Sequence, residues 1–287
     1  MNYRHGFHDG NFADVVKHAT LARILLHLSA KPVAFRVLDT HAGAGRYDLD
    51  GDEATRGGEW QAGIARLRDA RLAPEAAALL APYLAAIDAA NVAGLRRFYP
   101  GSPLIARAML REQDQLTACE LEPNAAAALS DALRGDHRTK AVAIDGWTAL
   151  KAYLPPKERR GLVVVDPPFE DPDEFAHLAG ALAAAHRKWP TGIMLAWYPI
   201  KRQADADRLV QQIRQTSPRD ALNVDFWVGD IRAESRLVAC GLMVINPPWT
   251  LEGELAVLLP ALAAILGQGR GGFRVARLGA DRAPRVL

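Results

Sequence analysis

The sequence has few cysteines, no long apolar run and almost no excess of charge. Its 287 residues include only Cys119 and Cys240, too few for the disulfide framework of a small secreted domain. The longest apolar run, residues 255–266, contains Pro260 and is too short to span a bilayer. The amino-terminal residues lack the apolar core of a signal peptide. We therefore expect a cytoplasmic globular protein with no membrane partner.

Charge is nearly balanced over the whole chain but not along it. The formal net charge is +2, from 35 basic and 33 acidic residues. Residues 1–36 carry five Lys or Arg against two acids, and the last 18 residues carry five arginines against Asp281. Basic ends suit a polyanionic partner. Ordinary solvated segments have the same composition, however, and charge alone favours that simpler interpretation.

Apolar, β-rich segments alternate with helical patterns along most of the chain. Strands are predicted at 35–39, 116–120, 141–144, 161–165, 192–197, 221–228 and 241–245. Helices are predicted at 11–29, 124–134, 172–187, 202–216 and 251–266. The first helix opens with Asn11 as its N-cap and Asp14 three residues later. This alternation predicts an α/β fold with a doubly wound, Rossmann-like sheet.

One long interval lacks the alternation. Between Gly45 and Leu116 there is no convincing strand, but helical patterns appear at 59–70, 74–90 and 103–111. The last of these opens with Ser102 as a predicted cap and Pro103 at the first helical position. We predict a helical insertion subdomain over 47–100, within a core formed by 1–46 and 101–287.

The glycine-rich turn after the first strand, with Gly43 and Gly45, lets a ligand approach the backbone. A dinucleotide-binding fingerprint requires a third glycine and an acid about 20 residues further on. Here the next acid at a strand end is Glu120, 75 residues after Gly45. An acid in that place can accept hydrogen bonds from both hydroxyls of a ribose. The pattern weakens the nicotinamide interpretation and leaves an adenosyl ligand open.

Asp145 and Gly146 follow the third strand and suit the same ligand. A carboxylate there can accept from an adenine amino group, and glycine leaves space beside it. Asp-Gly is also common in ordinary turns. Together with Glu120 and the two glycines, the pair supports a nucleoside site.

The strongest local motif is Asp166-Pro167-Pro168-Phe169, at the end of the fourth strand. Two prolines stiffen the turn and donate no N–H groups, so the Asp166 carboxylate and the Pro167 carbonyl form an acceptor-only pair. That pair matches the two N–H bonds of an exocyclic amino group, and Phe169 offers a ring on which a base can stack. An amine held in this way can attack a methyl sulfonium, with Asp166 as the proton acceptor.

A second turn, Asn246-Pro247-Pro248-Trp249, has a similar sequence and competes for this role. The fourth strand is expected beside the first, which places Asp166 next to the glycine-rich turn. In the methyltransferase version of this sheet the final strand is antiparallel, so its carboxyl end lies at the opposite edge. We therefore assign the chemistry to Asp166 and a structural role to Asn246.

These motifs together resemble the bacterial 23S ribosomal RNA adenine-N6 methyltransferases of the RlmJ type. The resemblance runs from Tyr3 to about Trp249. It includes the motifs described above together with Tyr3-Arg4-His5, Lys17-His18, the segment Asp39 to Tyr47 and Tyr99-Pro100-Gly101-Ser102-Pro103. Phe169 departs from the tyrosine often found in this turn, which keeps the stacking surface and loses a hydroxyl.

The resemblance implies a class I methyltransferase sheet, S-adenosylmethionine as cofactor and a monomer. Its implied substrate is one adenine of 23S ribosomal RNA, free or in an early assembly intermediate. Lys17 and His18 would contact the methionine end of the cofactor, and His41 and Ser102 would line the same pocket. The other implied roles are Glu120 at the ribose, Asp145 and Gly146 at the adenine, Asp166 as catalytic acceptor, and Tyr3, Pro167 and Phe169 at the target nucleotide.

Three alternatives stay open. The same turn also serves DNA adenine methylation, although no target-recognition domain is apparent. A non-catalytic RNA-binding or assembly factor could use a decayed methyltransferase fold, but Asp166, Glu120 and both glycines are all present. A nicotinamide-dependent reductase comes last. No metal site is predicted, because the histidines lack ligand spacing and neither cysteine has a partner nearby.

Overall fold

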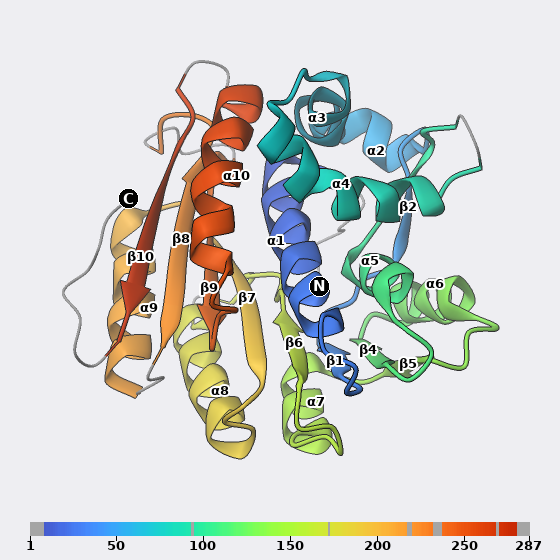
Figure 1. Cartoon of the computed structure of the whole chain (residues 1–287), viewed down its shortest axis with the longest axis vertical. Helices are drawn as coiled ribbons and strands as arrows, with labels where there is room; N and C mark the ends of the chain where they lie inside the picture. The colour runs from blue at the N-terminus through green and yellow to red at the C-terminus, as the bar shows by residue number, and fades with distance from the viewer. Residues whose placement is uncertain are drawn as a thin grey trace.

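The computed structural model describes residues 9–92, 95–171, 173–216, 220–231, 237–267 and 270–279. Within them a central eight-stranded sheet has the order β10-β8-β9-β7-β6-β1-β4-β5 (Figure 1). Its strands are β1 (Arg36–Asp39), β4 (Gln115–Glu120), β5 (Thr139–Ala143), β6 (Gly161–Val165), β7 (Ile193–Pro199), β8 (Ala221–Trp227), β9 (Ala239–Ile245) and β10 (Gly272–Leu278).

The strand directions fix where the loops with polar residues gather. β1 pairs in parallel with β4 and β6, β4 with β5, and β6 with β7. β9 is antiparallel to both β7 and β8, and β10 is antiparallel to β8. This mostly parallel order confirms the predicted α/β class, including β6 beside β1 and an antiparallel strand near the end of the chain.

Helices cover both faces of the sheet (Figure 1). One face carries α1 (Phe12–Ser29), α5 (Ser102–Met109), α6 (Pro123–Leu133) and α10 (Leu251–Leu266); the other carries α7 (Gly146–Tyr153), α8 (Glu174–Lys188) and α9 (Gln203–Thr216). Successive strand residues point to opposite faces, so Val37 belongs to one buried cluster and Leu38 to the other. The continuous apolar run Leu162 to Val165 is buried on both sides.

Helix α1 begins as the sequence predicts. The Asn11 side chain accepts hydrogen bonds from the backbone N–H groups of Ala13 and Asp14, so Asn11 is the N-cap. Asp14 does not complete the expected capping box, because its carboxylate instead accepts from the N–H of Gly10. Most of α1 is buried, since it packs against α5, α4 and α10 as well as the sheet.

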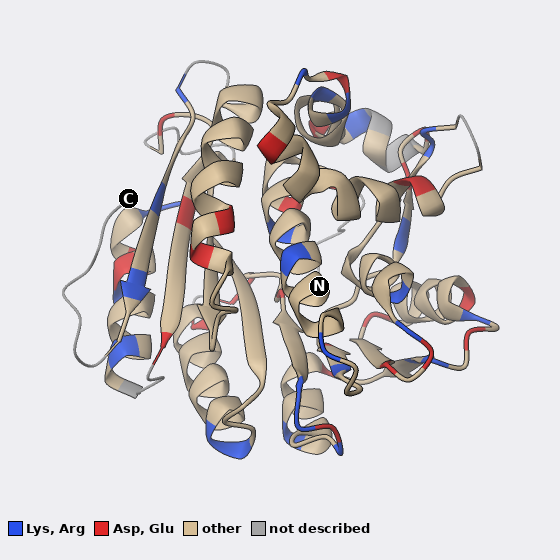
Figure 2. Ribbon diagram, viewed as in Figure 1, with Lys and Arg blue, Asp and Glu red and all other residues tan. Residues whose placement is uncertain are grey.

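The basic residues near the two ends mostly form internal ion pairs. Arg23 binds Glu254 at 2.9 Å and Arg36 binds Glu158 at 2.8 Å. Two arginines of β10 do the same, Arg274 with Asp225 and Arg277 with Asp220. In Figure 2 the two signs of charge are interspersed over the ribbon. For the described part of both ends, the simpler interpretation of the charge pattern holds.

The segment from 46 to 100 differs from the prediction in one respect. It contains two short strands, β2 (Arg46–Asp48) and β3 (Phe98–Pro100), which pair antiparallel, so the expectation of no strand here is wrong. Three-residue strands are too short to produce a visible alternation. Between them lie α2 (Asp52–Gly57), the π-helical turn η2 (Gln61–Ala65), α3 (Arg66–Asp69) and α4 (Pro74–Ala89). The last of these packs against α1 and α10.

Two further predictions need correction. Gly101, and not Ser102, occupies the N-cap of α5, because the helix begins at Ser102 itself. No strand was predicted after residue 245, whereas β10 pairs along the whole of β8. Charged residues in β10 obscure its pattern. In the described part of the chain, no helix has the length and apolar character needed to cross a membrane.

Candidate active site

Four acidic side chains come together where neighbouring parallel strands end. Asp39 is the last residue of β1, Glu120 ends β4, Asp145 follows β5 and Asp166 follows β6. Because β5, β4, β1 and β6 are consecutive in the sheet, these residues share its carboxyl edge. In open α/β sheets this edge is where ligands bind. The three acids predicted as site residues are therefore joined there by Asp39, which was not predicted.

The turn after β1 is tied to the end of β4. Gly43 and Gly45 have φ angles of +60° and +77°, a region that glycine adopts without strain. The Gly43 N–H donates to Glu120 Oε2 at 2.8 Å. A Cβ at Gly43 would lie 2.1 Å from the hydroxyl of Tyr47, so a larger residue does not fit. The glycines thus allow a sharp turn and a close contact.

Glu120 is held rigidly by the backbone. Its Oε1 accepts from the N–H groups of Leu121 and Glu122, both at 2.9 Å, in addition to the Gly43 contact at Oε2. An ionised carboxylate offers about four acceptor positions, so capacity is left for a ligand hydroxyl. This geometry is compatible with the predicted ribose contact.

Gly146 has a steric reason to be glycine. A Cβ there would lie 2.4 Å from the Thr40 carbonyl oxygen and 2.6 Å from the His41 ring. The His41 ring is also hydrogen-bonded to Thr40 Oγ1 at 2.8 Å and contacts Trp147 edge-on, with ring centroids 5.1 Å apart. Burial lowers the pKa of His41 to about 4, so its imidazole is neutral at neutral pH.

Asp145 acts as the N-cap of α7. Its carboxylate accepts from the N–H of Thr148 at 2.7 Å, which fixes the side chain at the start of the helix. The residue remains partly exposed. The hydrogen bond from Thr148 occupies one acceptor position of the carboxylate. The other positions can accept from an adenine amino group, as predicted.

Ser102 and Asp39 form a buried pair. Ser102 Oγ donates to Asp39 Oδ2 at 2.6 Å, and both residues are more than nine-tenths buried. Burial raises the pKa of Asp39 to about 7, despite the Ser102 hydrogen bond, which favours ionisation. The sequence contained a usable signal for Asp39, since an acid that ends a buried strand just before a glycine turn is unusual.

The side chain of Lys17 bridges two carboxylates. Its ammonium lies 2.9 Å from Asp14 Oδ1 and also binds Asp166 Oδ2, with all three side chains nearly inaccessible to solvent. Burial opposes the positive charge, but Asp14 and Asp166 together raise the pKa of Lys17 above its ordinary value. Helix α1 thus places a cation at the carboxyl edge of β6, a contact that was not predicted.

His18 follows Lys17 and meets two tyrosines that the sequence analysis did not single out as site residues. Its Nδ1 lies 2.7 Å from the Tyr99 hydroxyl, and the Tyr99 and Tyr83 hydroxyls are 3.0 Å apart. Burial raises the pKa of Tyr83 and of Tyr99 above their ordinary values, so both phenols stay protonated. Nothing in the sequence reveals this contact, which depends on the packing of α4 and β3 against α1.

Pro167 and Phe169, the other predicted site residues of the Asp166 turn, differ in their exposure to solvent. Pro167 is buried, and Phe169 adopts a φ of +51°. The Phe169 ring packs against Phe175 and Trp197, with centroid distances of 4.9 and 5.9 Å, while part of its surface stays exposed. Tyr3, the remaining predicted substrate residue, lies outside the described residues.

The competing Asn246 turn is at the opposite edge of the sheet. Asn246 has a φ of +52°, and its Nδ2 donates to the carbonyls of Pro190 and Gly192, each at 2.8 Å. Those two residues precede β7, so they mark the amino edge of the parallel strands. The expectation that Asn246 lies away from the site is confirmed. Trp249 in this turn is 81% exposed.

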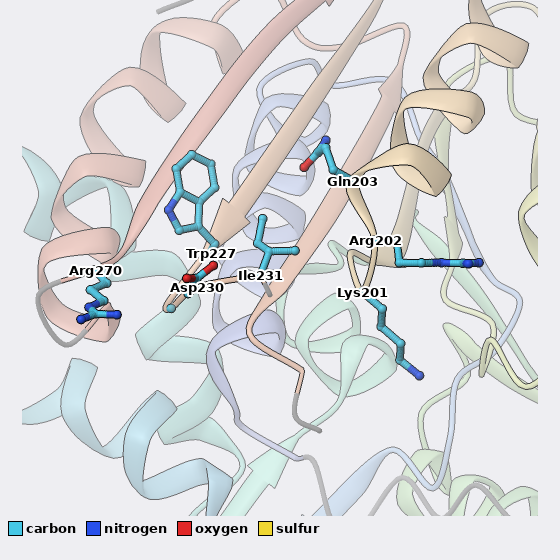
Figure 3. A pocket seen from close by; sticks show the side chains of 8 residues that line it. Lys201, Arg202, Gln203, Trp227, Asp230, Ile231 and Arg270 are labelled. Atoms are coloured by element: carbon cyan, nitrogen blue, oxygen red, sulfur yellow. The ribbon is translucent and has the colours of Figure 1, made fainter. Parts of the chain in front are cut away.

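Two hollows extend the carboxyl edge beyond the Asp166 turn. One, of about 530 Å³, begins at Phe169 and Phe175; the next, of about 790 Å³, contains Trp227 and Arg270 (Figure 3). Lys201 and Arg202, which follow β7, line both. Asp166, Lys17 and Glu120 line neither, whereas Phe169 of the Asp166 turn lines the first. In the described residues no cluster of His, Cys, Asp or Glu is arranged to hold a metal ion.

Comparison with protein families gives one match over most of the chain. The family model described as "Ribosomal RNA large subunit methyltransferase D, RlmJ" matches residues 32–278. That range contains β1, the glycine turn, the segment 46–100 and both Pro-Pro turns.

Individual relatives agree with this match. "Ribosomal RNA large subunit methyltransferase J" of Escherichia coli is 40% identical over 91% of this chain and 92% of its own length. The protein of the same name from Haemophilus influenzae is 38% identical over 96% of this chain and 98% of its own. A crystal structure of a Legionella pneumophila protein, 32% identical, superimposes with a TM-score of 0.86 over 96% of this chain and 99% of that one.

Proposed function

Because the chain belongs to the RlmJ family of ribosomal RNA large subunit methyltransferases, we propose that it methylates the N6 amino group of one adenine in 23S ribosomal RNA. S-adenosylmethionine is the proposed cofactor. The observation that carries the proposal is the position of Asp166, which ends a buried parallel strand and binds Lys17 at the carboxyl edge of the sheet.

The residues at this edge fit S-adenosylmethionine. The cofactor contains a sulfonium and an ammonium cation, and four acidic side chains share this edge, one of which, Asp166, binds the buried Lys17. Gly43 and Gly146 pack so closely against Tyr47, Thr40 and His41 that no side chain fits there, which fixes the two turns beside these acids. The charge of the acidic side chains suits a cationic nucleoside ligand.

We assign the parts of the cofactor as the family resemblance implies. Glu120 accepts from the ribose hydroxyls, and Asp145 and Gly146 border the adenine. Lys17, His18, His41, Ser102 and Asp166 surround the methionine end. Lys17 has three N–H donors and uses two on Asp14 and Asp166, so one is left for the cofactor carboxylate.

Asp166 is the proposed catalytic residue. The bound cofactor supplies an electrophilic methyl group on a cationic sulfur. Lys17 binds Asp166 through Oδ2 and orients the carboxylate, while Asp166 Oδ1 and the Pro167 carbonyl accept the two N–H bonds of the adenine amino group. The nitrogen forms its bond to the methyl carbon as the carbon–sulfur bond breaks. Asp166 then takes the amine proton, and holding the reactants in place supplies much of the rate.

The target adenine must leave its stack to reach Asp166, and a single-stranded or weakly paired nucleotide costs least to extrude. The exposed part of the Phe169 ring is the proposed stacking surface for that base, fixed from behind by Phe175 and Trp197. Tyr3 stays a predicted contact of the same nucleotide.

A tritium-transfer assay tests the function. The purified protein and labelled S-adenosylmethionine are offered 23S ribosomal RNA from a strain without the modification, mature large subunits, and double-stranded DNA. We expect N6-methyladenosine in the free RNA alone. Label in DNA would show that the substrate is DNA and not RNA, with the same methyl-transfer chemistry. Cofactor binding without transfer to any of the three would contradict the proposed activity.

The remaining expectations are also proposals. We propose that the protein acts as a monomer on free RNA or an early assembly intermediate, and that 47–100 is an insertion into the core. Light scattering of the purified protein, with and without RNA, measures the oligomeric state.

A further inference from the structure

A chain of buried polar groups connects the segment 47–100 to the proposed cofactor site. Tyr83 of α4 and Tyr99 of β3 are both fully buried, and their hydroxyls are 3.0 Å apart. Tyr99 continues the chain to His18 Nδ1 at 2.7 Å. On the other side of the imidazole, His18 Nε2 lies 3.9 Å from Asp14 Oδ1, the same oxygen that binds Lys17 at 2.9 Å.

The protons in this chain can be counted. Each phenol has one proton to donate, and burial keeps both phenols in the protonated form. A second cation beside buried Lys17 is unfavourable, so His18 is neutral and carries one ring proton. The Asp14 carboxylate faces Nε2 and favours a proton there, which leaves Nδ1 as an acceptor. With Nδ1 as the acceptor, the chain runs in one direction: Tyr99 donates to His18 Nδ1, and Tyr83 donates to Tyr99.

We propose that Tyr99 is a positioning residue that holds His18 as the neutral tautomer with its proton on Nε2, at the methionine end of the cofactor. An N–H donor beside Lys17 suits the carboxylate of a bound amino acid group. The inference rests on the proposed function for the identity of the ligand. It also gives the segment 47–100 a part in the reaction, since that segment supplies both phenols.

The structure contains a matched control. Tyr83→Phe and Tyr99→Phe each remove one hydroxyl from an equally buried ring that lies near the His18 ring, but only the Tyr99 hydroxyl is hydrogen-bonded to His18. In Tyr83→Phe the bond from Tyr99 to His18 is retained. A purely structural role would therefore make the two variants equivalent, whereas the proposed role separates them.

The first readout requires neither RNA nor cofactor. In the full-length protein labelled with ¹⁵N-histidine, we expect the His18 ring at pH 7.5 to show a protonated Nε2 and an unprotonated Nδ1. Tyr83→Phe should keep that pattern, and Tyr99→Phe should lose it. A wild-type His18 with its proton on Nδ1, or on both nitrogens, would overturn the proposal even if the Tyr99 variant failed to fold.

The second readout is cofactor binding by calorimetry. We expect Tyr99→Phe to weaken S-adenosylmethionine binding about 10-fold, which corresponds to the loss of one well-placed hydrogen-bond arrangement. Tyr83→Phe should change it less than 2-fold at a similar melting temperature. Equal effects of both variants would reduce Tyr99 to a packing role. Failure of methyl transfer to RNA in the wild type would refute the proposed function and leave these two measurements valid.

Discussion

The two Pro-Pro turns have nearly the same sequence and opposite surroundings. Asp166 follows a strand parallel to β1, so its carboxylate reaches the edge where Lys17, Glu120 and the glycine turn lie. Asn246 follows an antiparallel strand, and its side-chain amide donates hydrogen bonds to two backbone carbonyls. Strand direction, and not the local sequence, therefore separates a candidate catalytic turn from a structural one.

Their backbones differ as well. The left-handed residue is the fourth of the first turn, Phe169, and the first of the second turn, Asn246. Asn tolerates this conformation better than most residues, whereas Phe is held there by its aromatic neighbours. Two similar motifs thus place their aromatic residues differently: Phe169 packs into a cluster, and Trp249 is exposed to solvent.

The largest expected effect is on catalysis at the first turn. Asp166→Asn keeps the shape of the side chain but removes the proton acceptor, so we expect methyl transfer to fall about 10²–10⁴-fold. Cofactor affinity, measured by calorimetry, should change by less than 5-fold. Asn246→Ala is the matched control and should retain activity. An equal loss of activity in both variants would show that the wrong turn was chosen.

The second effect is on the pH dependence of stability, which should come from the carboxyl edge of the sheet and not from the amino edge. Burial raises the pKa of Asp39 to about 7, so between its ordinary value near 4 and pH 7 the folded protein holds a proton that the unfolded chain releases. Asp39 therefore lowers stability as the pH rises through that range, by up to about 4 kcal/mol. Asp39→Asn should remove this loss.

Urea unfolding at pH 5 and pH 8 measures the difference. The wild type and Asn246→Ala should show nearly the same pH dependence, because the main partners of Asn246 are two uncharged backbone carbonyls and its contact with the His186 ring is long, at 3.5 Å. An Asp39→Asn protein that loses as much stability as the wild type between the two pH values would contradict the assignment.

The next effect is on stability at the second turn. Asn246→Ala removes two hydrogen bonds and places alanine at a φ of +52°, so we expect the free energy of unfolding to fall by about 1–3 kcal/mol. Asn246→Gly loses the same bonds but relieves the backbone strain, and should be the milder change. Chemical denaturation of both proteins tests this order, and a larger loss for glycine would reverse the interpretation.

The smallest effect belongs to the aromatic residue of the second turn. Trp249 is 81% exposed, so Trp249→Ala should change the free energy of unfolding by less than about 0.5 kcal/mol and leave methyl transfer unaltered. Thermal melting and the transfer assay measure the two quantities. A marked loss of activity would indicate that the amino edge also contacts the substrate.

Much of this arrangement follows from local sequence. Buried parallel strands such as Gly161 to Val165 are continuous apolar runs, so the sequence shows where each strand ends. The acidic residues at those ends can therefore be recognised from the sequence. The short strands β2 and β3 and the charged strand β10 were missed, because three residues show no period and Arg274 and Arg277 break the apolar pattern. Those arginines pair with acids of other segments, which no local pattern shows.

The same limit applies to the site. Asp166 and Glu120 could be predicted from their motifs, whereas the bridge from Asp14 through Lys17 to Asp166 and the contact of His18 with Tyr99 could not. Lys17 and Asp166 are 149 positions apart in the sequence, and His18 and Tyr99 are 81 positions apart. Such contacts depend on how α1 packs, and packing is set by the whole sheet.

The packing of α1 also has a consequence for synthesis on the ribosome. This helix is synthesised before β6, β9 and α10, against which it packs, and Lys17 lies 149 residues before its partner Asp166. At about 5–20 residues per second, that separation corresponds to roughly 7–30 s of translation. Until α10 has emerged, α1 lacks part of its docking surface, so α1 cannot reach its final packing when it is first synthesised.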